Sequence, residues 1–365
     1  MTTPVAADAA RTNKPHISVV MVTRNVERFL GESIESILAQ NFQNFEFVIV
    51  DFGSTDNSPS IVSRYAATDS RIKFHVIPGC GLAEARNESC RLALGRYIAI
   101  MDADDVALPS RLLWEAEFME QHPHVGVVGG AVEWIDSAGK PLMISRHPLE
   151  NSELQTALLT HSVVWQPTAL IRAEAFARAG QYRGAFAPAE DYDLWLRIAE
   201  HFEIANLERV VLQYRIHPHQ VSLQKCAQQT LAILGAQVSA SARRLGRPDP
   251  LDAVKELTPP LLLSLGVTEA QQRAELAANF WQWIQHMCRA GEYATALDGG
   301  LQFLQSHSDH VERQQVAEVK LLVGKLWWRH KQFAKGLLAI GQAIVIWPGI
   351  FGRLLEAVAR RTRRV

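Results

Sequence analysis

The sequence predicts an α/β protein, in which a doubly wound mixed sheet is followed by an all-α, helical C-terminal region. Short apolar runs rich in β-branched residues alternate with helical patterns of about a dozen residues through the first half of the chain. The apolar runs are nearly unbroken, which is typical of strands that are covered on both faces. From about residue 225 onward the hydrophobic spacing is that of helices alone.

The composition of the 365-residue chain is that of a globular protein, with 48% hydrophobic and 21% charged residues. A formal net charge of -1 gives no electrostatic reason to expect a nucleic acid partner. The four cysteines are scattered and form no C-x-x-C pair, which indicates reduced thiols in a cytoplasmic protein. Residues 1–15 lack the apolar core of a secretory signal, and we expect them to be disordered.

Four apolar runs predict the first strands, and three of these strands end in polar residues. The runs cover residues 16–22, 46–50, 72–77 and 97–101. The polar ends are residues 23–25, 51–56 and 102–105. Because ligands of such sheets bind beyond the carboxyl ends of the strands, we expect the three polar segments to converge on one crevice.

The third polar segment, Asp102-Ala103-Asp104-Asp105, places three carboxylates in four residues directly after an apolar run. Neighbouring carboxylates repel one another and resist burial. A divalent cation such as Mn²⁺ or Mg²⁺ would neutralise them while it holds a phosphate-bearing substrate. An Asp-rich turn that caps the helix predicted near Pro109 explains the same residues without a metal. This segment by itself leaves both explanations open.

Later in the chain, residues 189–197 predict a helix that begins with Glu190, Asp191 and Asp193. Acidic residues in a first turn complement the helix dipole, which by itself is a sufficient explanation. Strands are also predicted at residues 125–132, 168–171 and 210–214. The glycine-rich loops of dinucleotide-binding folds and P-loop kinases are missing after the first strand, which argues against both classes.

Six motifs in order resemble those of the inverting family 2 glycosyltransferases, which have the GT-A fold. The motifs are Ser18–Asn25, Val50–Asp56, Gly81–Asn87, Met101–Asp105, Glu190–Trp195 and Tyr214–His217. Any one of them is weak, but six in the right order and at similar spacing are specific. The resemblance covers residues 16–224, which we take as the glycosyltransferase domain.

The resemblance implies a role for each matching residue. Asp104 would ligate the metal directly, and Asp102 would lie nearer the ribose or a metal-bound water. Asp191 would be the general base, and Glu190 and Trp165 would lie in the acceptor region. His217 would approach the diphosphate and metal, although an ordinary surface histidine explains it as well. The residues placed at the nucleotide-sugar site are Thr23, Asn25, Asp51, Phe52, Arg86, Asp102 and Ala103.

Two positions depart from the family pattern. Many members have a second aspartate where this chain has Phe52, and that aspartate often accepts a hydrogen bond from uracil. Many also have an aromatic residue that stacks on the base where this chain has Arg24. We therefore expect Phe52 or Arg24 to supply the stacking surface. UDP is the default donor nucleotide, with dTDP and GDP sugars left open.

The resemblance thus implies an inverting, metal-dependent transfer of a sugar from a nucleotide-diphosphate sugar to a hydroxyl of a glycan or lipid-linked acceptor, in cell-surface polysaccharide assembly. The alternative is a catalytically silent sugar-nucleotide-binding or scaffold protein with a similar domain. The presence of Asp102, Asp104 and Asp191 argues against a catalytically silent protein. A nucleotidyltransferase would share the metal carboxylates, but it would need a glycine-rich, basic phosphate loop that residues 23–25 do not provide.

Residues 225–365 predict a helical C-terminal domain that contains helical hairpins, since residues 289–297 echo residues 329–337. We expect residues 336–350 to form a buried helix rather than a membrane contact. The tail carries Arg353, Arg360, Arg361, Arg363 and Arg364. Such a tail is either a solvated helix end or a peripheral contact with anionic lipid at the inner face of the membrane.

Overall fold

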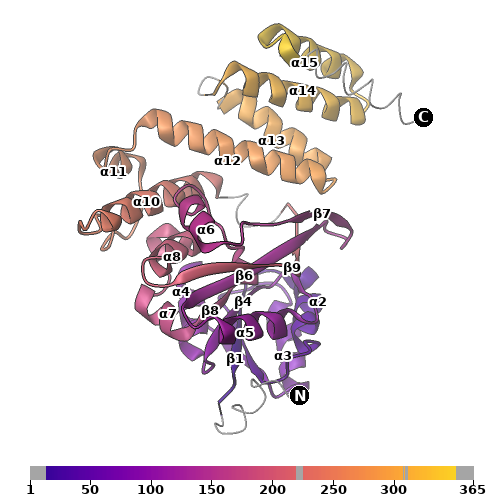
Figure 1. The fold of residues 1–365 in the computed structure, drawn as a ribbon. Helices are drawn as coiled ribbons and strands as arrows, with labels where there is room; N and C mark the ends of the chain where they lie inside the picture. Colours follow the sequence, from indigo (N-terminus) through magenta and orange to yellow (C-terminus); the bar gives the residue numbers. More distant parts are fainter. Residues whose placement is uncertain (1–13, 219–224, 307, 309–310, 351–365) are drawn as a thin grey trace. The chain divides into compact units, whose positions relative to one another are not determined.

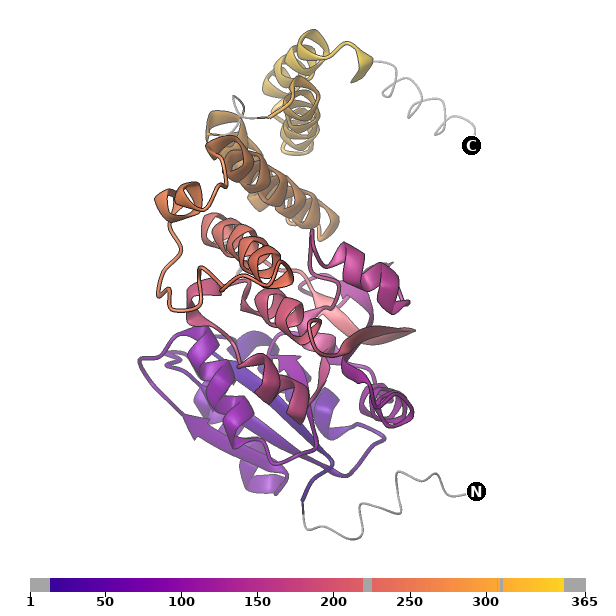
Figure 2. The ribbon, with the colours of Figure 1, turned by 60° about the vertical axis from the view of Figure 1, so that its left-hand side comes forward.

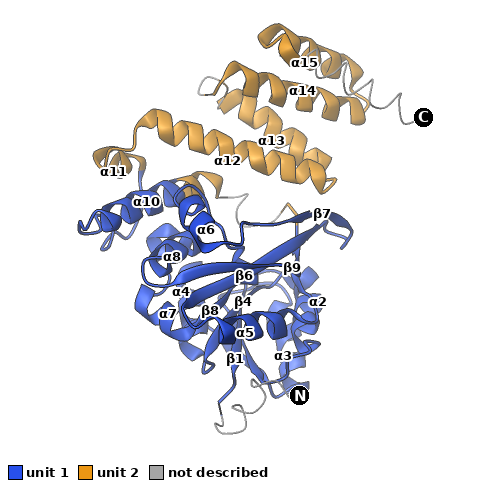
Figure 3. Cartoon of the chain, viewed as in Figure 1, with its two compact units in different colours: residues 1–215, 231–258 blue, residues 216–230, 259–365 orange. Residues whose placement is uncertain are grey.

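The computed structural model describes residues 14–218, 225–306, 308 and 311–350. Nearly all of the N-terminal segment expected to be disordered, and all of the arginine-rich tail, lie outside the described residues. The chain groups into two compact units, shown in Figure 3. The first comprises residues 1–215 and 231–258, and the second comprises residues 216–230 and 259–365.

The first unit is built on a mixed sheet of nine strands within the described residues, in agreement with the predicted fold class (Figure 1). The strand order is β3-β2-β1-β4-β8-β6-β9-β5, and β7 pairs with β6. The strands are β1 (Ile17–Thr23), β2 (Phe45–Asp51), β3 (Ile72–Val76), β4 (Tyr97–Asp102), β5 (Val106–Ala107), β6 (Val125–Ile135), β7 (Pro141–Ser145), β8 (Leu170–Arg172) and β9 (Glu203–Arg215).

The parallel half of the sheet aligns the polar strand ends that the sequence predicts. Strands β1 to β4 are parallel, and every residue of β2 is buried. In the register of the sheet Thr23 pairs with Asp51, and the neighbouring Val22 pairs with Asp102. The three polar segments therefore leave the sheet at the same edge, as expected, and the crevice between them stays a prediction.

The other half of the sheet is largely antiparallel. Strand β8 runs antiparallel to β4 and β6, whereas β6 and β9 are parallel. Strand β9 has 13 residues, and the sequence predicts only its last part because Glu208 and Arg209 interrupt the apolar pattern. The long strand matters for the site because its last residue, Arg215, lies beside the acidic turn.

Helices flank the sheet, as the two views in Figures 1 and 2 show. They are α2 (Glu27–Leu38), α3 (Ser58–Thr68), α4 (Leu82–Leu92), α5 (Arg111–Gln121), α6 (Asn151–Ala157), α7 (Ala173–Ala179) and α8 (Glu190–Ile198), with short 3₁₀ turns at Gln166–Thr168 and Gly184–Phe186. Helix α8 begins with the predicted acidic residues and buries nearly all of its side chains. It therefore holds its first turn rigidly.

A charged network ties residues 231–258 to the sheet domain. The Asp249 carboxylate accepts hydrogen bonds from the guanidinium groups of Arg183 at 2.9 Å and Arg243 at 2.6 Å. It also accepts hydrogen bonds from the Ser239 hydroxyl and the Leu251 backbone N–H. Burial raises the pKa of Asp249, but these donors outweigh burial and lower the pKa to about 2. The first unit therefore extends beyond the sheet into α10 (Cys226–Arg244).

The second unit is helical, in agreement with the predicted C-terminal region. Its helices are α11 (Pro259–Ser264), α12 (Glu269–Arg289), α13 (Tyr293–Ser306), α14 (Arg313–Arg329) and α15 (Phe333–Ile346). The two echoing segments form matching turns, with positive φ at Gly291 and at Lys331. Gly324 and Gly336 bring α14 and α15 together, because a Cβ on either would lie 2.9 Å from the carbonyl oxygen of the other.

The expectation of a buried helix at residues 336–350 is wrong for one face of α15. Gly336 and Ala343 are buried, but Leu337, Leu338 and Val345 are exposed. The sequence pattern is apolar on both faces, and in the described residues only one face finds a packing partner. Within that same part of the chain, none of the helices is both long and apolar enough to cross a bilayer.

Replacing the carboxylate at the centre of the charged network should destabilise the first unit. We expect Asp249→Asn to lower the free energy of unfolding at pH 7 by about 2 kcal/mol, because charged hydrogen bonds are lost. Since the folded pKa of Asp249 lies below its usual value of 3.8, this stabilisation is present above about pH 4 and is lost as the pH falls towards 2. Urea unfolding at several pH values measures both effects.

The matched control is Asp252→Asn, which changes an exposed aspartate of the same segment. Its free energy of unfolding should equal that of the unaltered chain. Equal losses in the two variants, or a loss in Asp249→Asn that does not shrink with falling pH, would contradict the role of the network.

Candidate functional site

The acidic turn after β4 is held in place by a serine side chain of α2. The Ser33 hydroxyl lies 2.9 Å from the carbonyl oxygen of Ala103 and 2.6 Å from that of Asp105. Ser33 and Asp105 are fully buried, so this contact lies in the interior. The turn is therefore a fixed part of the sheet domain rather than a free loop.

Arg215, the last residue of β9, holds the other side of the turn. Its backbone N–H donates to Oδ1 of Asp105 at 2.8 Å, and its Nε donates to the carbonyl oxygen of Asp104 at 2.8 Å. A third hydrogen bond joins Nη2 to Glu32 at 2.6 Å. Sequence reasoning gave Arg215 no role, although a lone arginine that ends an apolar strand was a usable signal.

Arg86 of α4 joins two acidic segments that are far apart in the sequence. Its guanidinium donates to Oδ1 of Asp102 at 3.2 Å and to Oε1 of Glu190 at the start of α8. The Glu190 side chain is 1% exposed and that of Arg86 is 14% exposed. The structure therefore brings Arg86, Asp102 and Glu190 together, with Asp191 next in the chain.

Burial and mutual repulsion raise the pKa values of these carboxyl groups. The pKa of Asp102 is raised to about 6 by burial, with further contributions from Asp104 and Glu190. The pKa of Asp191 is raised to about 7 by burial and by Glu190, while Arg86 opposes the shift. Burial and the neighbouring aspartates raise the pKa of Asp105 well above its usual value. The cluster thus has more carboxyl groups than arginines, and burial favours the neutral form of these three.

The same cluster has unsatisfied oxygen atoms. Oδ2 of Asp105 and Oε2 of Glu190 are buried and accept no hydrogen bond from any described residue. Oxygen ligands in a negatively charged site suit Mg²⁺ or Mn²⁺. Across the described ranges, no three His, Cys, Asp or Glu side chains converge closely enough to hold an ion alone. A metal here would be completed by oxygen atoms of water or substrate, as is usual for Mg²⁺.

The loops after β1 and β2 are joined through the Asp51 carboxylate. Oδ2 of Asp51 accepts a hydrogen bond from Thr23 at 3.1 Å, and Oδ1 accepts two more from the backbone N–H groups of Gly53 and Ser54. Asn25 has a positive φ of 54°, and its side-chain oxygen accepts a hydrogen bond from the backbone of Thr55. Thr23, Asn25 and Asp51 therefore shape the predicted nucleotide end by tying its two loops together.

Phe52 and Arg24 lie together at this end of the sheet. The guanidinium carbon of Arg24 is 5.6 Å from the centre of the Phe52 ring, a cation–π distance. Phe52 is 9% exposed, so the ring is largely covered. The two positions at which the chain departs from the family pattern are thus in contact with each other.

Trp165 belongs to an aromatic cluster that borders the acidic turn. Its ring centre lies 5.5 Å from that of Tyr214, 5.1 Å from that of His147 and 6.1 Å from that of Trp134. Burial raises the pKa of Tyr214 well above its usual value, and the nearby Asp105 adds to the shift. His217 is buried and groups with the second unit, so its predicted metal contact remains a prediction.

Comparisons with known proteins agree with the geometry. The family model described as glycosyl transferase family 2 matches residues 18–180. An uncharacterized glycosyltransferase of Methanocaldococcus jannaschii is 32% identical over 209 residues, which are 56% of this chain and 72% of that protein. WbnJ, an O-antigen biosynthesis glycosyltransferase of Escherichia coli, is 31% identical over 205 residues, which are 55% of this chain and 80% of that protein.

A similarity to a solved structure concerns the fold alone. The crystal structure of S. aureus TarS 1–349 in complex with UDP-GlcNAc aligns with a TM-score of 0.50 at 18% identity. The alignment covers 89% of this chain and 90% of that chain. It agrees with the predicted GT-A-type sheet domain followed by helices.

Removing the Arg86 cation should destabilise the folded chain, because it leaves Glu190 and Asp102 buried and unpaired. We expect Arg86→Gln to lower the free energy of unfolding by about 3 kcal/mol, measured by urea unfolding. Adding Glu190→Gln should restore part of that loss, since one of the unpaired charges is then removed. Arg91→Gln, on the exposed face of the same helix, is the matched control and should cost less than about 1 kcal/mol. Equal losses for the two arginines would contradict the bridge.

Proposed function

The chain belongs to glycosyl transferase family 2, and on this premise we propose that it moves a sugar from a nucleotide-diphosphate sugar to an acceptor hydroxyl, with inversion at the anomeric carbon. The observation that carries the proposal is the pair Glu190–Asp191, which Arg86 joins to the acidic turn at the edge where three strands end. The acceptor is a glycan or a lipid-linked molecule, and the O-antigen role in WbnJ's name supports cell-surface polysaccharide assembly.

Asp191 is proposed as the general base. Its pKa of about 7 makes its carboxylate basic enough to take a proton near neutral pH. A carboxylate oxygen of Asp191 accepts the proton of the acceptor hydroxyl while the hydroxyl oxygen forms a bond to the anomeric carbon. The bond from that carbon to the diphosphate breaks on the opposite face, which inverts the configuration. The rigid first turn of α8 keeps the base in position.

Asp104 and Asp102 are proposed to hold Mn²⁺ or Mg²⁺, with oxygen atoms of water or substrate as the other ligands. The excess of carboxyl groups over arginines around the turn supports this assignment, and the unsatisfied oxygen atoms lie on the neighbouring Asp105 and Glu190. When bound, the ion would supply electrostatic stabilisation of the charge that develops on the departing diphosphate. Arg86 keeps Asp102 oriented and partly neutralised, which makes it a positioning residue for this site.

Phe52 and Arg24 are proposed to recognise the base of the donor nucleotide. The Asp51 carboxylate is occupied by Thr23 and by two backbone N–H groups, so it organises the loop. The exposed Arg24 guanidinium, which lies over the Phe52 ring, offers a surface on which a base can stack. Stacking tolerates different bases, so UDP is the default donor and dTDP or GDP sugars fit the same surface.

The acceptor is proposed to bind beside Glu190 and Trp165. The faces of Trp165 and His147 are partly exposed and can pack against a sugar ring. Burial lowers the pKa of His147 to about 4, so its ring is neutral at physiological pH. A cytoplasmic location is proposed from the four cysteines, each of which is a free thiol.

Asp191→Asn tests the base directly. We expect the rate of sugar transfer to fall by about 10²–10⁴-fold, because the amide cannot take the hydroxyl proton, while donor binding persists. Product formation and donor-induced thermal stabilisation are measured on the same protein, with exposed Asp298→Asn as the control. Transfer that survives Asp191→Asn would reject the base, and donor binding without transfer by the unaltered chain would favour a silent sugar-nucleotide-binding protein.

A thermal-shift screen of nucleoside diphosphates with and without Mn²⁺ tests the donor site. We expect one nucleotide to raise the melting temperature only when Mn²⁺ is present, because ligands stabilise the state that binds them. Asp104→Asn should remove the metal-dependent part, and Phe52→Asp should change the preferred base. A flat response to every nucleotide would contradict the proposed site, and an unchanged Phe52→Asp profile would place Phe52 outside the base pocket.

A further inference from the structure

The charge of the chain is strongly polarised along the sequence. Residues 1–318 carry a formal net charge of -10, and residues 319–365 carry +9. No Asp or Glu occurs between Glu318 and Glu356. The cations of this stretch that the structure describes are Lys320, Lys325, Arg329, Lys331 and Lys335. Within the described residues none of the five forms an ion pair with a carboxylate.

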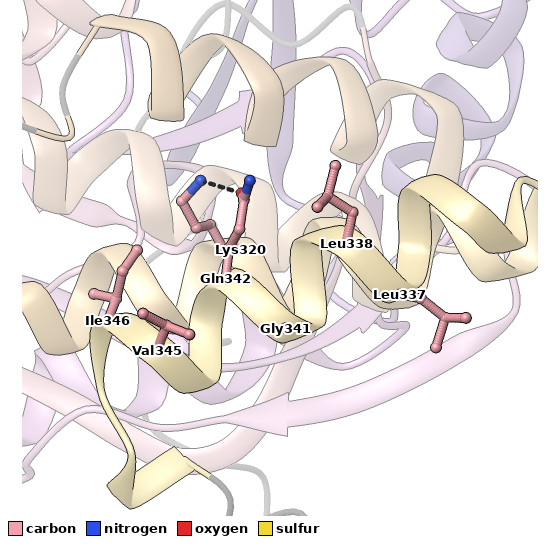
Figure 4. A pocket seen from close by; sticks show the side chains of 7 residues that line it. All are labelled: Lys320, Leu337, Leu338, Gly341, Gln342, Val345 and Ile346. Atoms are coloured by element: carbon pink, nitrogen blue, oxygen red, sulfur yellow. Dashed lines mark hydrogen bonds between the residues drawn. The ribbon is translucent and has the colours of Figure 1, made fainter.

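The same stretch presents apolar side chains to solvent. Leu337 is 59% exposed, Leu338 is 64% exposed and Val345 is 81% exposed, all on the outer face of α15. These residues line a groove of about 390 Å³, together with Gln342 of the same helix and Lys320 of α14 (Figure 4). The Lys320 ammonium donates to the Gln342 side-chain oxygen at 2.8 Å, so an amide is its hydrogen-bond partner.

Scattered exposed apolar residues need no explanation, but a contiguous set beside cations that no described carboxylate neutralises does. Arg329 and Lys335 instead lie over the rings of Tyr293 and Trp327. A nucleic acid would pair with the lysines, yet it would leave the leucines and the valine in water. A second copy docked by the same face would bring its own cations against them, which is electrostatically unfavourable. A surface with negative headgroups above an apolar interior satisfies both features together.

We propose that the α14–α15 hairpin docks on a bilayer that contains anionic lipids. The exposed Lys331 and Lys335 contact headgroup phosphates. Leu337, Leu338 and Val345 enter the boundary between headgroups and acyl chains. The contact is peripheral, since the outer face of one helix is the part that enters the boundary. This surface does not depend on the transfer reaction, so it can hold or fail independently of the proposed function.

Co-sedimentation of the full chain with vesicles tests the proposal. The vesicles are phosphatidylcholine alone or phosphatidylcholine mixed with phosphatidylglycerol. We expect binding to the anionic vesicles only, and weaker binding as salt is raised, because salt screens the lysines. Leu338→Glu with Val345→Glu should weaken binding at least about tenfold. Two apolar side chains that would enter the bilayer boundary are then replaced by negative charges, which the anionic surface repels.

Two matched variants separate this surface from the rest of the chain. Leu245→Glu places the same charge on an exposed apolar residue of the first unit and should leave vesicle binding unchanged. Lys331→Glu with Lys335→Glu should weaken binding at least about tenfold without changing the apolar side chains. Because these variants keep residues 351–365 intact, they distinguish the hairpin from the arginine-rich tail.

Four results would overturn the proposal. The first is no binding of the unaltered chain to either vesicle, and the second is equal binding to neutral and anionic vesicles. The third is full binding by both double variants, which would place the contact elsewhere. The fourth is a change in oligomeric state, or in binding to duplex DNA, on Leu338→Glu with Val345→Glu while vesicle binding stays the same.

Discussion

The negative charge gathered at the carboxyl end of β4 is the constraint on which the first unit depends. Asp102, Asp104 and Asp105 fill one short turn, and the Arg86 bridge brings Glu190 to the same place. Carboxylates collected in this way destabilise a fold unless cations and hydrogen bonds compensate them. Arg86 reaches them from α4 and Arg215 from the end of β9, so helix, strand and turn hold one another in place. The incomplete compensation leaves the site suited to a metal ion and a phosphate.

Much of the fold could be predicted because its signals are local. Unbroken apolar runs identify β1, β2 and β4, and the hairpin turn at residues 136–139 follows from its Asp and Gly. The length of β9 could not be predicted, since Glu208 and Arg209 hide its first half. The exposed face of α15 was also missed, because an apolar pattern does not tell which of two faces finds a partner.

The candidate site, like the fold, could be predicted from the sequence only in part. The acidic turn and the start of α8 are visible as short motifs, and the family resemblance links the two. The Arg86–Glu190 bridge joins residues 104 positions apart, and Ser33 reaches across 72 positions to Asp105. Such pairs depend on how strands and helices pack, so no spacing in the sequence reveals them. Arg215 lies in one of the motifs, but its contacts with Asp104 and Asp105 are also long-range and could not be predicted.

The net charge of -1 is a poor guide to the binding partners of this chain, because it is the sum of two regions of opposite charge. An anionic surface repels residues 1–318 and attracts residues 319–365, so the interaction depends on which part of the chain approaches first. Both effects fade within a Debye length, about 10 Å at 0.1 M salt, so only charges close to the surface count. The apolar side chains of α15 act over a shorter range still, and they add binding only once the lysines have brought the helix into contact. Attraction and insertion are therefore successive requirements, and the hairpin carries the residues for both.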